Sequence, residues 1–243
     1  MNLTDNDLRL LKEKYPHNLE DILKKIKNNY PIQYLIGNVN FYGYPINVDE
    51  SVLIPRFETE QLVEKTIDLI KKYNFLNASI LDIATGSGCI AITLKKELPT
   101  LKIEALDYSV KALKKASENI NLNNVDISLF KHDILKDTLT KKYDLIISNP
   151  PYVPKNQPVE KNIAYEPQDA IFASHNGLLF YEKIAAIAPN IVHQKSIIAL
   201  EINYDQKQQV IALFQKKFPK SKIFCEQDYN GFDRFIFILN NCE

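Results

Sequence analysis

The stretch of the sequence best suited to chemistry is a tetrapeptide, Asn149-Pro150-Pro151-Tyr152, that directly follows an apolar run. Proline fixes φ and has no N–H group, so we expect the carbonyl oxygens of Asn149 and Pro150 to remain free as acceptors. The Asn149 side-chain oxygen and the Pro150 carbonyl oxygen can then hold both hydrogens of a planar NH2 group, on which Tyr152 can stack. The tetrapeptide therefore predicts a site that orients an amide or aromatic amine nitrogen for reaction, without a metal or a covalent nucleophile.

A second candidate site is the glycine loop at residues 81–88, Leu-Asp-Ile-Ala-Thr-Gly-Ser-Gly, which ends one apolar run and opens a helical pattern. Glycine lets the backbone approach a ligand closely, and a strand before and a helix after are the context of a nucleotide-binding turn. Asp107 ends the next predicted strand, where it can accept hydrogen bonds from a ribose diol. Ala84 replaces the first glycine of the usual triplet, which disfavours a dinucleotide. S-adenosylmethionine has no phosphate and tolerates that change better.

These two patterns lead us to expect cofactor contacts from Ala84, Thr85, Gly86, Ser87, Gly88 and Asp107. Asp133, after the third predicted strand, can meet an adenine amino group, although a cap or a surface acid explains it equally well. Structural alternatives also exist for the glycine loop, as a turn that serves helix packing, and for the tetrapeptide, as a proline-rich turn begun by Asn149. The functional interpretation is favoured because ligands bind at the carboxyl edge of open sheets.

The elements that position these residues are strands that alternate with helices along the chain. This alternation predicts an open, Rossmann-like α/β sheet of seven parallel strands that helices cover on both faces. Short apolar runs predict strands at 79–83, 103–106, 127–130, 145–148, 197–201, 223–226 and 235–239. Amphipathic patterns predict helices at 90–98, 110–121, 178–189 and 206–218. Residues 150–176 have no clear periodicity, and a loop that long at a strand end is usually part of a site.

The amino-terminal quarter of the chain has different patterns. Helical spacing of leucine and isoleucine predicts two short helices, with Thr4 or Asp5 as the first cap and Pro16 between the helices. Residues 35–55 suit a β-hairpin, and a helix is expected at 58–73. We therefore divide the chain into a helical appendage (1–30), a β-hairpin linker (31–57) and a cofactor-binding domain (58–243).

Composition restricts the possible classes of protein. Thirty basic and 30 acidic side chains give zero net charge, so no long-range attraction to nucleic acid is expected. Three cysteines without a C-x-x-C spacing argue against a disulfide framework and a zinc site, and Cys89 is expected to be a small packed residue rather than a nucleophile. No signal peptide and no run of 18 apolar residues is found. We expect a cytoplasmic protein with no membrane contact.

Five segments together resemble a known family, the glutamine N5-methyltransferases that modify peptide-chain release factors. They are residues 33–37, 53–60, 81–88, 148–152 and 165–167. Amino methyltransferases that act on DNA share the tetrapeptide but lack the Ile-Pro-Arg segment that precedes Glu58-Thr59-Glu60. That segment therefore distinguishes the two groups.

The resemblance implies methyl transfer from S-adenosylmethionine, with S-adenosylhomocysteine as product, to the side-chain amide nitrogen of the glutamine in a Gly-Gly-Gln loop of release factors. It implies a cofactor that spans the glycine loop, Asp107, Asp133, Ile134 and Asn149. The substrate glutamine would lie against the tetrapeptide, Asn149, Pro150, Pro151 and Tyr152. Arg56, Glu58 and Thr59 would form part of the pocket wall, with a surface ion pair as the alternative for Arg56.

The chain departs from the family pattern at three places. Ala84 stands where the family usually has glycine, which should only narrow the turn, and Ile134 replaces a frequent aromatic residue, so adenine would be held by apolar contact. The helical appendage is also short.

Two other functions fit parts of the sequence. An N6-adenine or N4-cytosine methyltransferase would use the same tetrapeptide on a flipped base of DNA or RNA, but zero net charge and the lack of a further recognition domain argue against it. A cofactor-binding module without catalysis would not need Asn149 aimed at a nitrogen atom. We expect a monomeric enzyme.

Overall fold

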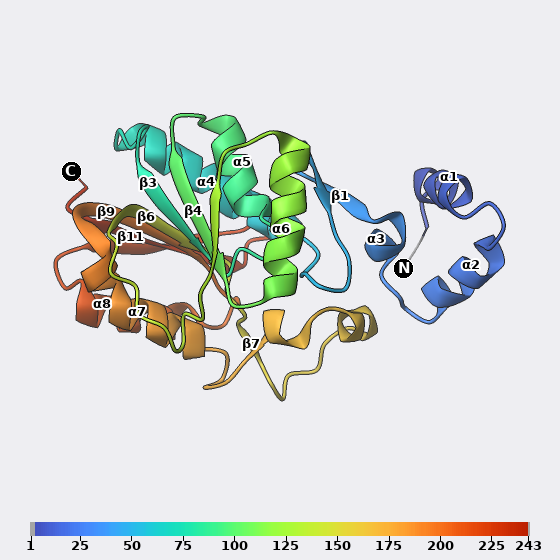
Figure 1. Ribbon diagram of the computed structural model, residues 1–243. Helices are drawn as coiled ribbons and strands as arrows, with labels where there is room; N and C mark the ends of the chain where they lie inside the picture. The colour runs from blue at the N-terminus through green and yellow to red at the C-terminus, as the bar shows by residue number, and fades with distance from the viewer. Residues whose placement is uncertain (1–2, 243) are drawn as a thin grey trace.

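A seven-stranded sheet forms the centre of the molecule (Figure 1), in a computed structural model that describes residues 3–242. Its strand order is β10-β11-β9-β6-β3-β4-β5. The strands are β3 (Ser79–Ile83), β4 (Lys102–Asp107), β5 (Ser128–Lys131), β6 (Tyr143–Ser148), β9 (Val192–Glu201), β10 (Lys222–Gln227) and β11 (Asp233–Asn240). Each lies where an apolar run predicted it, and the predicted α/β fold class is confirmed.

The direction of β11 differs from the predicted all-parallel sheet. β11 pairs antiparallel with both β9 and β10, whereas the pairs β9–β6, β6–β3, β3–β4 and β4–β5 are parallel. Only residues 228–232 connect β10 to β11. A parallel neighbour needs a crossover of a dozen or more residues, so this short connection forces a hairpin.

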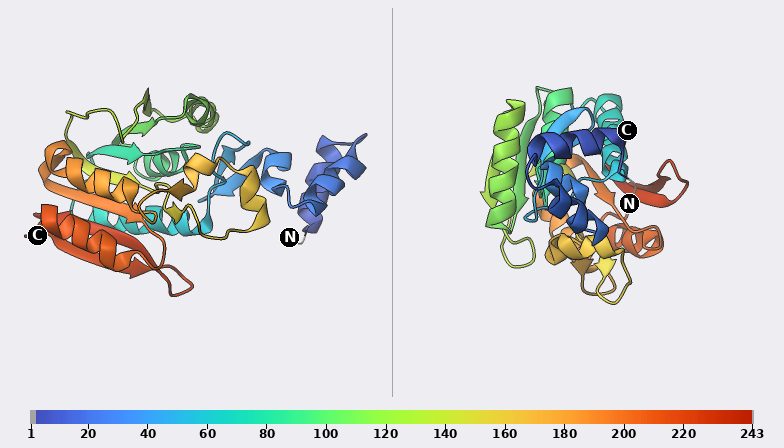
Figure 2. Two further views of the ribbon diagram at one scale, coloured as in Figure 1. Left: turned by 90° about the horizontal axis from the view of Figure 1, so that it is seen from below. Right: turned by 90° about the vertical axis from the view of Figure 1, so that its right-hand side faces the viewer.

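Helices cover both faces of the sheet, as predicted (Figures 1 and 2). The helices α4 (Phe57–Lys72), α5 (Cys89–Glu97) and α6 (Val110–Asn123) pack on one face, and α7 (Leu179–Ile191) and α8 (Lys207–Lys217) pack on the other. Alternate residues of a strand enter the two cores. Ile80 of β3 packs with the first group and Leu81 with the second. Burial on both faces explains why these strands read as continuous apolar runs.

Three short helices form a separate unit at the amino terminus, which projects beyond the sheet (Figure 2). They are α1 (Asp5–Lys14), α2 (Leu19–Lys27) and α3 (Ile32–Ile36). Thr4 caps α1: its Oγ1 accepts a hydrogen bond from the Asp7 N–H at 3.1 Å, and Asp7 bonds back to the Thr4 N–H. Their shared apolar cluster consists of Leu11, Ile22, Ile26, Ile32 and Leu35.

The predicted β-hairpin at residues 35–55 is shorter in the structure. Its strands are β1 (Asn38–Phe41) and β2 (Tyr44–Asn47). Residues 32–36, which the sequence assigned to the linker, instead form α3, because burying Ile32 and Leu35 against α1 and α2 removes their apolar surface from water. Gly37 ends α3 with φ 91°, a conformation that favours glycine.

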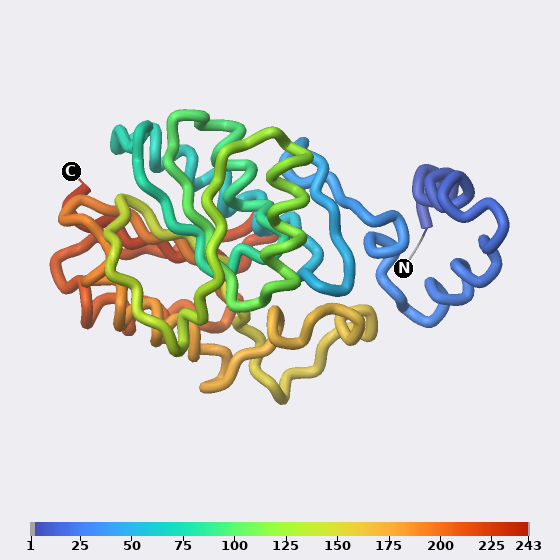
Figure 3. The backbone as a smooth tube through the Cα atoms, viewed as in Figure 1, coloured from blue at the N-terminus to red at the C-terminus, as the bar shows by residue number. Residues whose placement is uncertain are grey.

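The long segment after the tetrapeptide, whose path Figure 3 traces in yellow and light orange, has short elements of its own. They are β7 (Val153–Pro154), the 3-10 helices η1 (Lys161–Tyr165) and η2 (Gln168–Ala170), and β8 (Phe172–Ala173), which pairs with β7. The Tyr165 hydroxyl donates to the Asn28 carbonyl oxygen at 3.1 Å, and the rings of Tyr30 and Tyr165 meet edge to face. The segment therefore connects the sheet edge with the amino-terminal unit.

Within residues 3–242, no helix combines the length and apolar character needed to cross a bilayer.

The amino-terminal cluster yields a stability prediction. Leu11 is fully buried among residues of α2 and α3, so Leu11→Ala should weaken this unit by about 2–5 kcal/mol. Hydrogen exchange should show faster exchange of the α1 and α2 amides, with β3 and β6 unchanged. Leu3→Ala, at a position that is 37% exposed, is the control. Unchanged protection of α1 in Leu11→Ala would contradict the role of this cluster.

Candidate active site

The candidate site lies at the carboxyl edge of three neighbouring strands, β6, β3 and β4. Because these strands are parallel and in register, with Ile83 paired to both Ser148 and Leu106, they end at the same level. The glycine loop follows β3, Asp107 ends β4 and Asn149 follows β6. The two patterns that the sequence singled out therefore meet at one edge.

A cavity of about 110 Å³ opens between these strand ends and the start of α4. Of the residues proposed from the sequence, it is lined by Arg56, Thr59, Ala84, Thr85, Gly86, Ser87, Asp107, Asn149 and Pro151. These nine proposed cofactor and substrate residues thus share one cavity.

A second cavity, of about 270 Å³, adjoins the first and is lined by Asp133 and Ile134. Ala84, Asp107, Tyr108, Asp169 and Phe180 line both cavities. The carboxylate of Asp133 accepts the Leu135 N–H at 3.0 Å, so it also caps a local turn, and a bond from Lys136 lowers its pKa.

The two glycines of the loop have different surroundings. A Cβ added to Gly86 would meet nothing within 4 Å, so this residue borders open space in the first cavity. A Cβ on Gly88 would lie 3.3 Å from the side chains of Ala116 and Ile92, so Gly88 permits close packing of α5 against α6 and lines neither cavity. Gly88 thus serves helix packing, the structural alternative for this loop, while Gly86 is placed to contact a ligand.

Ala84 occupies a backbone conformation that is unusual for its type. Its φ is 60°, which costs an L-residue about 1–2 kcal/mol. The substitution of alanine for glycine was expected only to narrow the turn. The structure instead shows that it strains the backbone where the two cavities meet.

Two buried acids accept hydrogen bonds from the glycine loop. Asp107 accepts hydrogen bonds from the Gly86 N–H at 3.0 Å and the Ser109 N–H at 2.9 Å, and burial raises its pKa. Its oxygens retain lone pairs for a ligand hydroxyl. Asp82 is fully buried and accepts from the Thr85 hydroxyl at 2.6 Å, and burial raises its pKa to about 7.

Asn149 is held by a chain of hydrogen bonds behind the cavity. Its Nδ2 donates to Thr59 Oγ1 at 2.9 Å, and the Thr59 hydroxyl donates to Glu201 Oε2 at 2.8 Å. The other oxygen of Glu201 accepts from the Tyr152 hydroxyl at 3.1 Å. The Asn149 side-chain oxygen is thus the end of the amide that Thr59 does not bind.

Several predicted residues lie beside the cavities instead of lining them. Pro150 is buried, and Tyr152 packs partly buried against the core of α7 and α8 while its hydroxyl faces Glu201. Glu58 lines neither cavity. Stacking of Tyr152 on a substrate therefore remains a prediction.

Arg56 combines both roles that the sequence left open. It lines the first cavity, and its Nη2 lies 2.5 Å from Glu166 Oε1 in an ion pair. The partner is buried rather than on the surface, and the other oxygen of Glu166 accepts the Ile54 N–H at 3.0 Å. Glu166 therefore fixes the segment that enters α4.

Among the residues at the site that sequence reasoning missed are Tyr108, Asp169, Phe180 and Glu201. The first three line both cavities, and the Tyr108 hydroxyl donates to Asp169 at 2.8 Å. The position of Tyr108 directly after Asp107, and of Glu201 as the acid that ends an apolar run, could have indicated them. Asp169 and Phe180 give no comparable sequence signal.

Cys89 is a packed residue at the cavity wall. It is buried, and burial raises the pKa of its thiol to about 12, so it is protonated at neutral pH. Among residues 3–242, no three His, Cys, Asp or Glu side chains gather in a way that could hold a metal ion.

Two features of the site fit the contacts that the sequence led us to expect for S-adenosylmethionine. Gly86 leaves its backbone open to the cavity, and Asp107 offers a carboxylate to a ribose diol at the end of the next strand. The Ser87 hydroxyl is buried without a hydrogen-bond partner among the described residues.

Sequence comparison gives a consistent set of relatives. Residues 59–172 match the model of the methyltransferase small domain. The chain is 40% identical to a release factor glutamine methyltransferase of Lactococcus lactis subsp. lactis, over 96% of this chain and 83% of the relative. It is 42% identical to the Streptococcus pneumoniae protein of the same name, over 90% of this chain and 78% of that protein.

Solved structures share the fold. A methyltransferase from Pyrococcus furiosus matches with a TM-score of 0.58 at 17% identity, covering 93% of this chain and 98% of that one. A T. thermophilus 16S rRNA methyltransferase in complex with AdoMet and guanosine matches with a TM-score of 0.60 at 13% identity, covering 84% and 50% of the two chains.

The unequal surroundings of the two glycines can be tested by a matched pair of variants. Gly86→Ala should weaken S-adenosylmethionine binding at least tenfold, about 1.4 kcal/mol, because its methyl group enters the cavity. Gly88→Ala should leave the affinity nearly unchanged. It should lower the unfolding free energy by about 1–3 kcal/mol more than Gly86→Ala does, because its methyl group overpacks the contact between α5 and α6. Calorimetric titration and denaturant unfolding measure the two effects. Wild-type affinity in Gly86→Ala would exclude the cofactor from this loop.

Proposed function

The chain belongs to the release factor glutamine methyltransferase family, and we propose that it methylates the side-chain amide nitrogen, N5, of the glutamine in the Gly-Gly-Gln motif of peptide-chain release factors. The methyl donor is S-adenosylmethionine. The observation that carries this proposal is that Asn149 lines the same cavity as Gly86 and Asp107. An acceptor for an NH2 group and an adenosine-type site thus lie within one space.

In this proposal the two cavities hold the cofactor. Ala84, Thr85, Gly86 and Ser87 border the donor through the glycine loop, and the Asp107 carboxylate binds the ribose hydroxyls. Asp133 and Ile134 hold the adenine in the adjoining cavity. Gly88 permits the packing of α5 against α6 and has no contact with the cofactor in this proposal.

Catalysis in this proposal is mainly positioning. An amide nitrogen is a poor nucleophile because its lone pair is delocalised into the carbonyl group. The Asn149 side-chain oxygen and the Pro150 carbonyl oxygen accept the two N–H groups, which orients the nitrogen and increases its electron density. S-adenosylmethionine, when bound, supplies an electrophilic methyl group on sulfur. Positioning of this kind contributes up to roughly 7–11 kcal/mol in favourable cases.

The remaining substrate contacts come from the same wall. Pro151 and Arg56 line the cavity beside Asn149, and Tyr152 confines the planar amide group. The nitrogen loses one proton on methylation, and the products are N5-methylglutamine and S-adenosylhomocysteine. Because release factors act in translation, we place the enzyme in the cytoplasm as a monomer that binds the release factor as its protein substrate.

The direct test is to incubate the protein with a purified bacterial release factor and methyl-labelled S-adenosylmethionine. We expect mass spectrometry to find one added methyl group on the glutamine of the tryptic Gly-Gly-Gln peptide. A release factor with glutamate in place of that glutamine is the control and should acquire no label. Label that appears only in DNA or RNA supplied separately would contradict the proposal and favour a nucleic-acid amino methyltransferase.

Removing the proposed acceptor should separate catalysis from binding. Asn149→Ala should lower kcat by about 10²- to 10³-fold, the usual cost of losing one preorganised polar group, with a smaller change in the KM for the release factor. Asn121→Ala, at an exposed position of α6, is the control and should keep wild-type rates. Steady-state kinetics with a fixed saturating cofactor measures both. Undiminished kcat in Asn149→Ala would remove this residue from the mechanism.

A further inference from the structure

Four side chains from three parts of the fold form a continuous hydrogen-bond path that ends at the substrate cavity. Asn149 follows β6, Thr59 lies in the first turn of α4, Glu201 ends β9 and Tyr152 closes the tetrapeptide. Thr59 is 2% exposed and Glu201 is 1% exposed. Glu201 lines neither cavity, so any effect it has on the reaction passes through its partners.

The direction of each bond in this path is set by the carboxylate. An ionised carboxylate has no hydrogen and can only accept, whereas a hydroxyl has one hydrogen to donate and lone pairs to accept with. Thr59 donates its hydrogen to Glu201 Oε2, so toward Asn149 it can only accept. The Asn149 amide must therefore turn its NH2 group to Thr59 and its oxygen away.

We propose that Glu201 is a positioning residue that determines, through Thr59, which end of the Asn149 amide faces the substrate. This inference rests on the proposed function, because it concerns the acceptor that Asn149 offers to the glutamine NH2 group. The other oxygen of Glu201 fixes the Tyr152 hydroxyl at 3.1 Å. One carboxylate thus orders two residues of the tetrapeptide at once.

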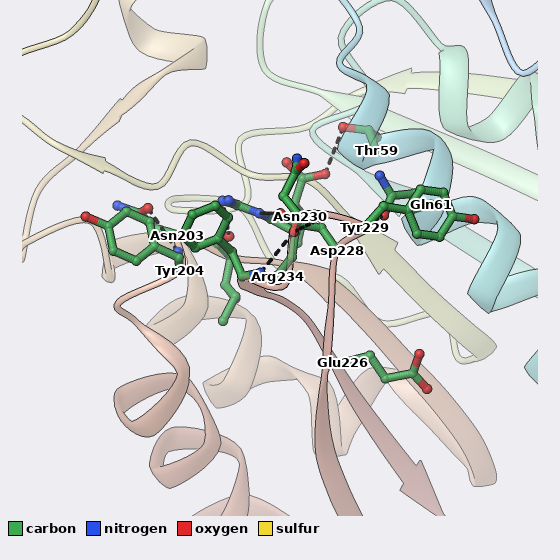
Figure 4. Close-up of polar contacts among 12 residues, drawn as sticks. Thr59, Gln61, Asn203, Tyr204, Glu226, Asp228, Tyr229, Asn230 and Arg234 are labelled. Carbon is green, nitrogen blue, oxygen red and sulfur yellow. Dashed lines mark hydrogen bonds and ion pairs between the residues drawn. The ribbon is translucent and has the colours of Figure 1, made fainter.

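Charged and titratable groups surround Glu201 on several sides. Arg234 of β11 favours its ionised form, Glu58 of α4 opposes it, and the hydroxyls of Thr59 and Tyr152 bond to it. The Tyr181 hydroxyl of α7 donates to the Glu201 backbone carbonyl oxygen at 2.7 Å. The charge of Glu201 also contributes to the raised pKa of the buried Cys89 thiol. Arg234 is itself held by Asp228 at 3.1 Å (Figure 4).

Burial outweighs these stabilising contacts and raises the pKa of Glu201 to about 7. Above this pH the carboxylate enforces the bond directions described here. Below it, the protonated group has a hydrogen that it can donate to Thr59, and the Thr59 hydrogen is then free to point at Asn149. Both orientations of the amide become possible, so methyl transfer should fall as the pH falls through about 7.

The experiment compares the wild type with Glu201→Gln, Thr59→Val and Thr59→Ser, using the release factor as substrate between about pH 6 and 9. In the wild type kcat should fall by up to about tenfold per pH unit on the acid side. Glu201→Gln and Thr59→Val should each lower kcat at pH 8 by about 10- to 100-fold, with little change in KM, and abolish the acid limb. Thr59→Ser keeps the hydroxyl and should restore most of the rate.

Two matched controls separate this path from general damage to the fold. Glu104→Gln removes a carboxylate of β4 that also accepts a tyrosine hydroxyl, from Tyr143 at 2.7 Å, away from the cavities. Thr66→Val makes the same change as Thr59→Val in the same helix, where the hydroxyl bonds only to the Leu62 carbonyl oxygen. Both should keep the wild-type rate and pH profile. A wild-type rate and pH profile in Glu201→Gln would overturn the inference.

A measurement without substrate tests the path even if release factors are not methylated. The ¹⁵N-labelled side-chain NH2 signals of Asn149, assigned with Asn149→Asp, should shift with pH around the pKa of Glu201 in the wild type and should not shift in Glu201→Gln. Asn149 signals that do not respond to pH in the wild type would refute the role of Glu201 in this hydrogen-bond path. Absence of methyl transfer by the wild type, with the shift present, would refute only the proposed function.

Discussion

Everything at the site depends on three neighbouring parallel strands that end at the same level. Ile83 of β3 is paired with Leu106 of β4 on one side and with Ser148 of β6 on the other. The register is secured because these strands bury side chains on both faces, so a slip of one residue would exchange the two faces. The glycine loop, Asp107 and Asn149 are close together for this reason alone, although they are far apart in the sequence.

Much of the fold could be predicted because buried strands and amphipathic helices leave simple patterns. The apolar run at 79–83 coincides with β3. β9 begins at Val192, five residues before the predicted start at 197. The prediction missed this part of the strand because residues 193–195 are exposed and polar and have no strand pattern. The prediction of a wholly parallel sheet was wrong for β11, and α3 was not predicted, because both features depend on tertiary packing. The direction of β11 follows from a short connection, and α3 follows from the burial of Ile32 and Leu35.

The candidate site was predictable where function sits in contiguous residues and unpredictable where it depends on distant ones. The glycine loop and the tetrapeptide are each local, and the cavity includes residues of both. Glu201 lies 49 residues after Tyr152, and Asp169 lies in the irregular segment that follows the tetrapeptide. No spacing rule connects either residue with the two motifs. The loop itself shows a further limit. Its sequence suggests two equivalent glycines, whereas one borders a cavity and the other separates two helices.

The reversed direction of β11 has a consequence for the chemistry of the edge. In a wholly parallel sheet, only the carboxyl termini of strands deliver side chains to the ligand side. Here Phe235 pairs with Glu201, so the first residues of β11 arrive at that side as well. Arg234 thereby brings a positive charge that favours the ionised form of Glu201, the acid that ends β9. The hairpin thus supplies a positive charge to the ligand side of the sheet from the start of a strand.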